Sequence, residues 1–104
     1  MEIDPKTLQQ KLASKTPPMV IDVRNPPETQ AGGVIEGAKL IPMDQLAARL
    51  SEIPADREVV AVCQKGMRSF NAAGWLRQSG RKAVSMQGGM DAWKALGLPV
   101  VTAR

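Results

Sequence analysis

The sequence predicts an α/β fold with a central, mainly parallel sheet flanked by helices on both faces. Two observations lead to this prediction. Segments with helical periodicity alternate along the chain with short apolar segments, which is typical of parallel sheets. The segment 59–62 is apolar throughout, as expected for a central strand that is buried on both sides. At 104 residues, the chain is long enough for one domain, 1–104.

The first half of the chain is predicted to begin with a helix that Asp4 caps, with a proline at its first position. Leu8 and Leu12 recur at helical spacing within it. The short apolar run 19–21 predicts a buried strand. The two prolines after this strand, together with the glycines that follow, predict a loop over 25–37.

The second half alternates in the same way. Residues 38–41 predict a short strand, and Asp44 caps a predicted helix that ends before the proline at position 54. After the strand 59–62, a helix is predicted with Ser69 as its cap and Gly80 at its carboxyl end. The rest of the chain predicts a strand at 83–86, a turn at 88–89 and a last short helix at 91–96.

The composition excludes several classes of chemistry. The chain has no histidine, which removes Ser-His-Asp and Cys-His catalysis and every histidine-ligated metal or haem site. Its single cysteine, Cys63, excludes an internal disulfide, a multi-cysteine zinc site and a paired redox motif. One phenylalanine and two tryptophans are too few for a platform on which nucleic-acid bases stack. We expect no metal and no cofactor.

The sequence also gives expectations about location. The first residues have no basic lead-in to an apolar stretch, so they do not resemble a secretory signal. The apolar runs are too short to span a bilayer, and a lone cysteine is typical of a reducing compartment. We therefore expect a cytoplasmic monomer that binds no membrane.

The charges are unevenly distributed. The net charge is +4, yet the stretch from Val59 to Met90 holds five basic residues and no acidic one. This stretch either forms a solvated helix face or creates a positive field around Cys63 that attracts small anions. The basic residues form no dense run and have no aromatic partners, so nucleic acid is not an expected partner.

Cys63 directly follows the predicted central strand, and a short loop containing Gly66 leads from it into the next helix. Backbone N–H groups and the helix N-terminus would face the sulfur there, while Lys65 and Arg68 add positive charge. Each of these effects favours the thiolate over the thiol. A lone cysteine after an apolar strand is often only a small buried hydrophobe, but that role requires neither a glycine turn nor two cations.

The segment Cys63-Gln64-Lys65-Gly66-Met67-Arg68-Ser69 resembles the active-site loop of the rhodanese (thiosulfate sulfurtransferase) family. The resemblance continues, in order, through Ile21-Asp22-Val23-Arg24 with Glu28, through Ile35–Ala38, and through Gln87–Gly89 with Trp93. It extends from Ile3 to Val100 and implies a complete single-domain, rhodanese-like fold. The family often has an aromatic residue, a histidine and a proline where this chain has Thr29, Val34 and Glu36, all outside the cysteine loop.

The resemblance implies a sulfurtransferase. A sulfane sulfur would move from thiosulfate, or a similar small anionic donor, through a persulfide on catalytic Cys63 to cyanide or a thiol, including a protein thiol. The implied substrate-binding residues are Gln64, Lys65, Gly66, Met67, Arg68 and Ser69. Lys65 matches a position where thiosulfate-using members carry lysine. Asp22, Arg24 and Glu28 are expected to support the site structurally, with an ion pair between Arg24 and Glu28.

Three other functions use a cysteine in a comparable loop or fold. A phosphatase of the tyrosine-specific type is disfavoured because four residues separate Cys63 from Arg68, one fewer than those enzymes have. A redox sensor is disfavoured because the chain has no second cysteine to resolve an oxidised thiol. The main alternative is a rhodanese-like module without turnover that carries sulfur or docks partners. Inactive modules commonly lack the cysteine, so the presence of Cys63 favours the enzyme.

Overall fold

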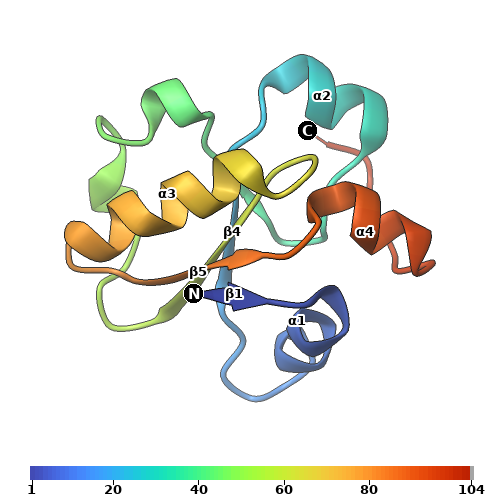
Figure 1. Cartoon of the computed structure of the whole chain (residues 1–104), viewed down its shortest axis with the longest axis horizontal. Helices are drawn as coiled ribbons and strands as arrows, with labels where there is room; N and C mark the ends of the chain where they lie inside the picture. Colours follow the sequence, from blue (N-terminus) through green and yellow to red (C-terminus); the bar gives the residue numbers. More distant parts are fainter. Residues whose placement is uncertain (104) are drawn as a thin grey trace.

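In the computed structural model, which describes residues 1–103, five parallel strands form one sheet with helices on both faces (Figure 1). The strands are β1 (Glu2–Ile3), β2 (Met19–Asp22), β3 (Lys39–Leu40), β4 (Glu58–Val62) and β5 (Lys82–Met86). Their order in the sheet is β1-β5-β4-β2-β3, and all four pairings are parallel. The predicted fold class is confirmed, and the apolar strand β4 is central, as its sequence indicates.

Four helices and two short 3-10 segments cover the sheet. The helices are α1 (Pro5–Leu12), α2 (Pro26–Gly32), α3 (Met67–Gln78) and α4 (Gly89–Ala95), and the 3-10 segments are Met43–Gln45 and Leu50–Glu52. On one face, Leu8 of α1 shares a buried apolar cluster with Trp93 of α4. On the other face, Leu76 of α3 packs with Ile53, which follows the second 3-10 segment.

The predicted loop over 25–37 is wrong in its first part, where α2 forms. Both prolines occupy the first turn of α2, where a backbone N–H has no helical partner to lose. The Glu28 carboxylate accepts a hydrogen bond of 3.0 Å from the backbone N–H of Asn25. An Asn followed three residues later by Glu is a capping signal. It was present in the sequence, and the two prolines masked it.

The predicted α-helix after Asp44 is also wrong, because that segment forms two 3-10 turns instead. The carbonyl of Leu50 would need an N–H from residue 54 to continue an α-helix, and residue 54 is a proline. That carbonyl accepts instead from the N–H of Ile53, at 3.0 Å, and from the guanidinium of Arg81, at 3.1 Å. The missing donor and the Arg81 contact explain the tighter turns.

The remaining elements lie close to their predicted positions. The strand expected at 83–86 is β5, the strand expected at 38–41 is the shorter β3, and the last helix begins two residues early, at Gly89. Strand β1 was missed, because its two residues carry no pattern. No helix within residues 1–103 is long and apolar enough to cross a membrane.

The sheet places the carboxyl ends of the neighbouring strands β2 and β4 side by side. Asp22, the last residue of β2, is paired in register with Val62, the last residue of β4. The next residue of the first strand, Val23, donates its N–H to the carbonyl of Val62 at 2.9 Å. Cys63 and Arg24 therefore leave the sheet side by side, at the edge where parallel sheets bind ligands.

Candidate active site

A tight loop joins β4 to α3 around the side chain of Cys63. Gly66 is the residue before α3, and its φ of 103° lies in the left-handed region that favours glycine. The helix begins at Met67, so the predicted cap, Ser69, lies in its first turn instead. The early helix start turns the Ser69 side chain toward the sulfur.

Three polar groups contact the sulfur of Cys63, and a fourth lies directly behind them. The backbone N–H groups of Gly66 and Ser69 donate to Sγ at 3.1 and 3.2 Å. The thiol in turn donates to Ser69 Oγ at 3.3 Å, and that oxygen lies 2.8 Å from Ser85 Oγ on β5. Two N–H donors that point at one buried sulfur stabilise negative charge on it.

The start of α4 fixes the backbone of this loop. The N–H groups of Met90 and Asp91 donate to the carbonyls of Cys63 and Gln64, at 2.9 and 3.0 Å. A Cβ on Gly89 would lie only 2.5 Å from both of those carbonyl oxygens, so the close approach requires glycine. The sequence predicted a turn at this glycine pair, and its role as a support for the cysteine loop was missed.

A buried ion pair supports the loop from the other side. Arg24 and Asp22 are each only 1% exposed, and Nη2 and Nε of the arginine donate to the two carboxylate oxygens at 2.7 and 2.9 Å. Arg24 also donates through Nη1 to Oε1 of Gln64 at 3.0 Å and through Nη2 to the carbonyl of Gly33 at 2.9 Å. The predicted supporting residues Asp22 and Arg24 thus connect β2 directly to the cysteine loop.

The predicted ion pair between Arg24 and Glu28 does not form. The guanidinium of Arg24 donates its hydrogen bonds to the partners just described. Glu28, on α2, points instead toward α3, the helix that follows the cysteine loop. The Glu28 carboxylate accepts two hydrogen bonds from the guanidinium of Arg68, at 2.7 and 2.8 Å. These bonds lower the pKa of Glu28 to about 2. Arg68 keeps its charge, since Glu28 raises the pKa of its guanidinium.

The basic residues between Val59 and Met90 do not all gather around Cys63. Of the five basic residues between Val59 and Met90, Arg77 and Arg81 donate to backbone carbonyls beyond the far end of α3. Lys65 does lie in the cysteine loop, but its ammonium group is 3.0 Å from the carboxylate of Asp91. The two cations of the loop, Lys65 and Arg68, are therefore each paired with a carboxylate from another helix, α4 for Lys65 and α2 for Arg68.

A pocket of about 310 Å³ opens onto Cys63, and we call it the Cys63 pocket. Its lining consists of Glu28, Cys63, Gln64, Lys65, Met67 and Arg68. The cysteine is 1% exposed, whereas Met67, at the rim, is 77% exposed. Four of the loop residues predicted to bind substrate, Gln64, Lys65, Met67 and Arg68, therefore line one small opening. Gly66 and Ser69 are not part of this lining, and Ser69 is buried.

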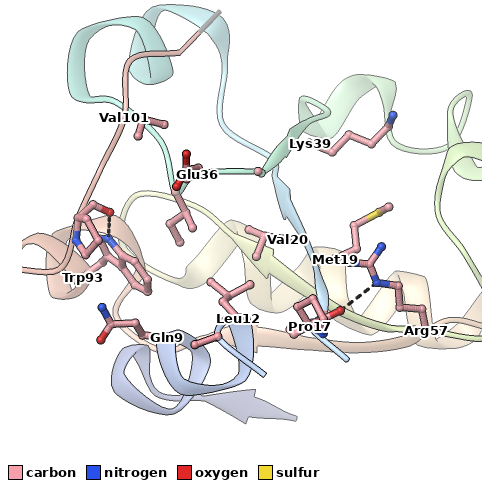
Figure 2. A pocket seen from close by; sticks show the side chains of 15 residues that line it. Gln9, Leu12, Pro17, Met19, Val20, Glu36, Lys39, Arg57, Trp93 and Val101 are labelled. Carbon is pink, nitrogen blue, oxygen red and sulfur yellow. Dashed lines mark hydrogen bonds between the residues drawn. The ribbon is translucent and has the colours of Figure 1, made fainter. Parts of the chain in front are cut away.

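A second hollow, of about 490 Å³, lies on the face of the sheet that α1 and α4 cover (Figure 2). Apolar side chains that include Leu12, Val20 and Trp93 line much of it. Among the described residues, this lining contains no cysteine or serine. Nor do residues 1–103 contain a group of three or more acidic or cysteine side chains that could hold a metal ion. Of these two hollows, the Cys63 pocket is the one whose lining includes the cysteine.

Comparison with known proteins identifies the family to which this loop belongs. The family model described as a rhodanese-like domain matches residues 4–96, which includes every element from α1 to α4. The chain belongs to the rhodanese family. The resemblance stated from the sequence is thereby confirmed.

Known rhodanese relatives match this chain along most of its length. A sulfurtransferase of Allochromatium vinosum is 42% identical, over 96% of this chain and 94% of that protein. A thiosulfate sulfurtransferase of Pseudoalteromonas translucida is 35% identical, over 82% of this chain and 81% of that protein. A crystal structure of a rhodanese-like domain protein from Staphylococcus aureus, 36% identical, superposes with a TM-score of 0.87 over 97% and 98% of the two chains.

Three further residues contribute to this rhodanese site, and sequence reasoning missed the role of each: Ser85, Gly89 and Asp91. They lie at least 16 residues beyond the cysteine loop, on β5 and α4. Each contacts the loop only because β5 lies beside β4 and the chain then turns back into α4. Figure 1 shows the loop that precedes α3 between α2 and α4. No spacing pattern in the sequence marks such contacts.

Proposed function

We propose that this rhodanese is a sulfurtransferase that carries a sulfane sulfur on Cys63 as a persulfide, with thiosulfate or a similar small anion as donor. The observation that carries the proposal is the pair of backbone N–H groups, from Gly66 and Ser69, that point at the sulfur. They stabilise the negative charge that Cys63 Sγ carries as the attacking thiolate and again as the thiolate released when the acceptor removes the outer sulfur. The name of the Pseudoalteromonas relative, a thiosulfate sulfurtransferase, supports the choice of donor.

The reaction proceeds by double displacement. The Cys63 thiolate attacks the outer sulfur of thiosulfate, a bond forms between the two sulfur atoms, and the sulfur–sulfur bond of thiosulfate breaks. The bonding pair leaves with sulfite, and Cys63 becomes a persulfide anion. Cyanide or a thiolate then attacks the outer sulfur of this persulfide, and the bond between the two sulfur atoms breaks. The product leaves as thiocyanate or as a new persulfide, and the bonding pair restores the Cys63 thiolate. Neither step transfers a proton, so neither needs a general base.

The surrounding residues have separate tasks in this proposal. The N–H groups of the loop hold the charge on sulfur, and Lys65 and Arg68 stand at the pocket where a donor anion arrives. Arg24 keeps Gln64 in place through a hydrogen bond of 3.0 Å. The acceptor, a thiol or cyanide, enters through the same opening, because the Cys63 pocket includes the cysteine in its lining.

A second candidate function is a sulfur carrier that passes the persulfide to a partner protein without rapid turnover. The exposed apolar side chains of Met67 and Phe70, one turn apart at the start of α3, favour this candidate, because adjacent apolar side chains beside the pocket suit contact with another polypeptide. The two functions share the persulfide. They differ in whether a small thiol or cyanide discharges it quickly.

Intact-mass spectrometry tests both. Incubation with thiosulfate is expected to increase the mass of the protein by one sulfur atom, and Cys63→Ala is expected to abolish the increase. Added cyanide should then remove the extra mass and release thiocyanate at a catalytic rate. A persulfide that forms but is not discharged by small acceptors would favour the carrier. An unchanged wild-type mass would exclude thiosulfate as the donor.

A further inference from the structure

Both cations of the cysteine loop are neutralised by carboxylates from outside the loop. Glu28, on α2, binds the guanidinium of Arg68 through both of its oxygens, at 2.7 and 2.8 Å. Asp91, on α4, lies 3.0 Å from the ammonium group of Lys65. The four charges sum to zero. Together with an ionised Cys63, these four side chains carry one net negative charge, which disfavours a dianion.

We propose that Glu28 is a specificity-determining residue, which makes the Cys63 pocket less favourable for dianions such as thiosulfate than for sulfur compounds with one negative charge or none. This inference rests on the proposed sulfurtransferase function and concerns the choice of substrate for it. Removal of the Glu28 charge would leave Arg68 unscreened beside the sulfur and would reverse the preference.

Glu28 is better placed for this role than Asp91. Its carboxylate is part of the lining of the Cys63 pocket, whereas Asp91 is not. The side chains of Glu28 and Arg68 are 31% and 39% exposed, while that of Lys65 is 83% exposed, so water screens the lysine pair far more. With its pKa lowered to about 2 by the bonds from Arg68, Glu28 stays ionised at every physiological pH.

Glu28 also has a structural contact, since its carboxylate accepts from the N–H of Asn25 at 3.0 Å. A loss of activity in a variant would therefore not separate charge from structure. The rate at which Cys63 is alkylated does separate them when two reagents of similar size are compared. Iodoacetate carries a negative charge and iodoacetamide carries none, and both react with the same thiolate. Their rate ratio reports the electrostatic potential at the sulfur and cancels changes in the thiolate fraction.

In Glu28→Gln, we expect the rate ratio of iodoacetate to iodoacetamide to rise about fivefold at low ionic strength, as for the loss of one negative charge near the sulfur. Glu28→Asp, which keeps the charge, should stay near the wild type. The matched control is Glu36→Gln, because Glu36 is exposed and makes no ion pair within residues 1–103. A ratio in Glu28→Gln equal to that of the wild type would overturn the proposal.

A salt titration of the wild type tests the same point without any variant. A pocket without net positive charge should show an iodoacetate rate that stays constant or rises with salt, whereas an unscreened cation would make it fall. A steep fall in the wild type would overturn the proposal. With thiosulfate as substrate, Glu28→Gln is expected to lower KM severalfold. Alkylation needs only the thiolate, so it still decides the charge question if thiosulfate proves not to be a donor.

Discussion

The hydroxyl oxygen of Ser85, on β5, lies 2.8 Å from that of Ser69, and Ser69 Oγ lies 3.3 Å from the sulfur of Cys63. Both serines are fully buried. With the thiol protonated, its hydrogen points at Ser69 Oγ. When the thiol ionises, the Ser69 hydroxyl can turn its own hydrogen to the sulfur, and Ser85 can then donate to Ser69. The two serines therefore form a chain of hydroxyls that can adapt to either state of the sulfur.

Substitution of these serines should slow the alkylation of Cys63 by iodoacetamide in a graded way. Ser69→Ala removes a direct hydrogen bond to the thiolate, worth about 1 kcal/mol or roughly a fivefold loss of rate. Ser85→Ala removes only the donor to Ser69, so a smaller loss is expected. Ser79→Ala is the control, because its hydroxyl binds the carbonyl of Trp75 at the other end of α3. If Ser85→Ala leaves the rate at the wild-type value, the chain of hydroxyls plays no part.

The buried pair of Asp22 and Arg24 should dominate the stability of the site. Asp22→Asn keeps the shape of the side chain but leaves Arg24 buried without a counter-charge, which typically costs about 3–5 kcal/mol. Asp91→Asn breaks an exposed, solvent-screened pair and should cost much less than Asp22→Asn. Urea unfolding of the two variants measures both values. Equal losses would contradict the assignment of the Asp22 pair as the support of the loop.

The pattern of the sequence was sufficient for the sheet and for the position of Cys63. Both depend on local features: the apolar run of β4 marks a central strand, and a residue that follows such a strand must lie at the carboxyl edge of the sheet. The helix α2 also had a local signal, the capping spacing of Asn25 and Glu28, but the two prolines between them were interpreted as a break.

The partners of the charged and polar side chains could not be predicted in the same way. Arg68 and Glu28 are 40 residues apart, and Gln64 and Asp91 are 27 residues apart. Such contacts depend on how α2 and α4 are placed around the loop, which follows from the whole topology rather than from spacing. The short separation of Arg24 and Glu28 suggested an ion pair. In the fold, Arg24 points into the protein, with no exposed side-chain surface.

The bond between Glu28 and Arg68 predicts a dependence of stability on acid pH. The pKa of Glu28 is about 2 in the folded protein against an ordinary value of 4.5, mainly because of the hydrogen bonds from Arg68. The folded state therefore gains stability from ionised Glu28 above about pH 4.5, and this gain is lost as the pH falls toward 2. Glu28→Gln should be less stable than the wild type at neutral pH, and urea unfolding should show that difference shrink in acid.

Some acid sensitivity will persist in Glu28→Gln, since Arg49 and Lys39 likewise lower the pKa of Glu52 to about 2. The decisive quantity is therefore the difference between the variant and the wild type at each pH. A difference that does not change between neutral and acid pH would mean that Glu28 acts through its shape and not through its charge.

The contact of Gly89 with the cysteine loop predicts a large effect from a single methyl group. Gly80 and Gly89 both have a positive φ, of 86° and 61°, so alanine strains the backbone at either position by about 1 kcal/mol. Around Gly80 there is open space, whereas at Gly89 the new Cβ would lie 2.5 Å from the carbonyl oxygens of Cys63 and Gln64. To relieve this clash, α4 must move away from the loop and weaken the hydrogen bonds that Met90 and Asp91 donate to it.

Gly89→Ala should therefore lose several times more stability than Gly80→Ala in urea unfolding. It alone should change the rate of Cys63 alkylation under native conditions. Equal behaviour of the two variants would show that the loop does not depend on α4 for its shape.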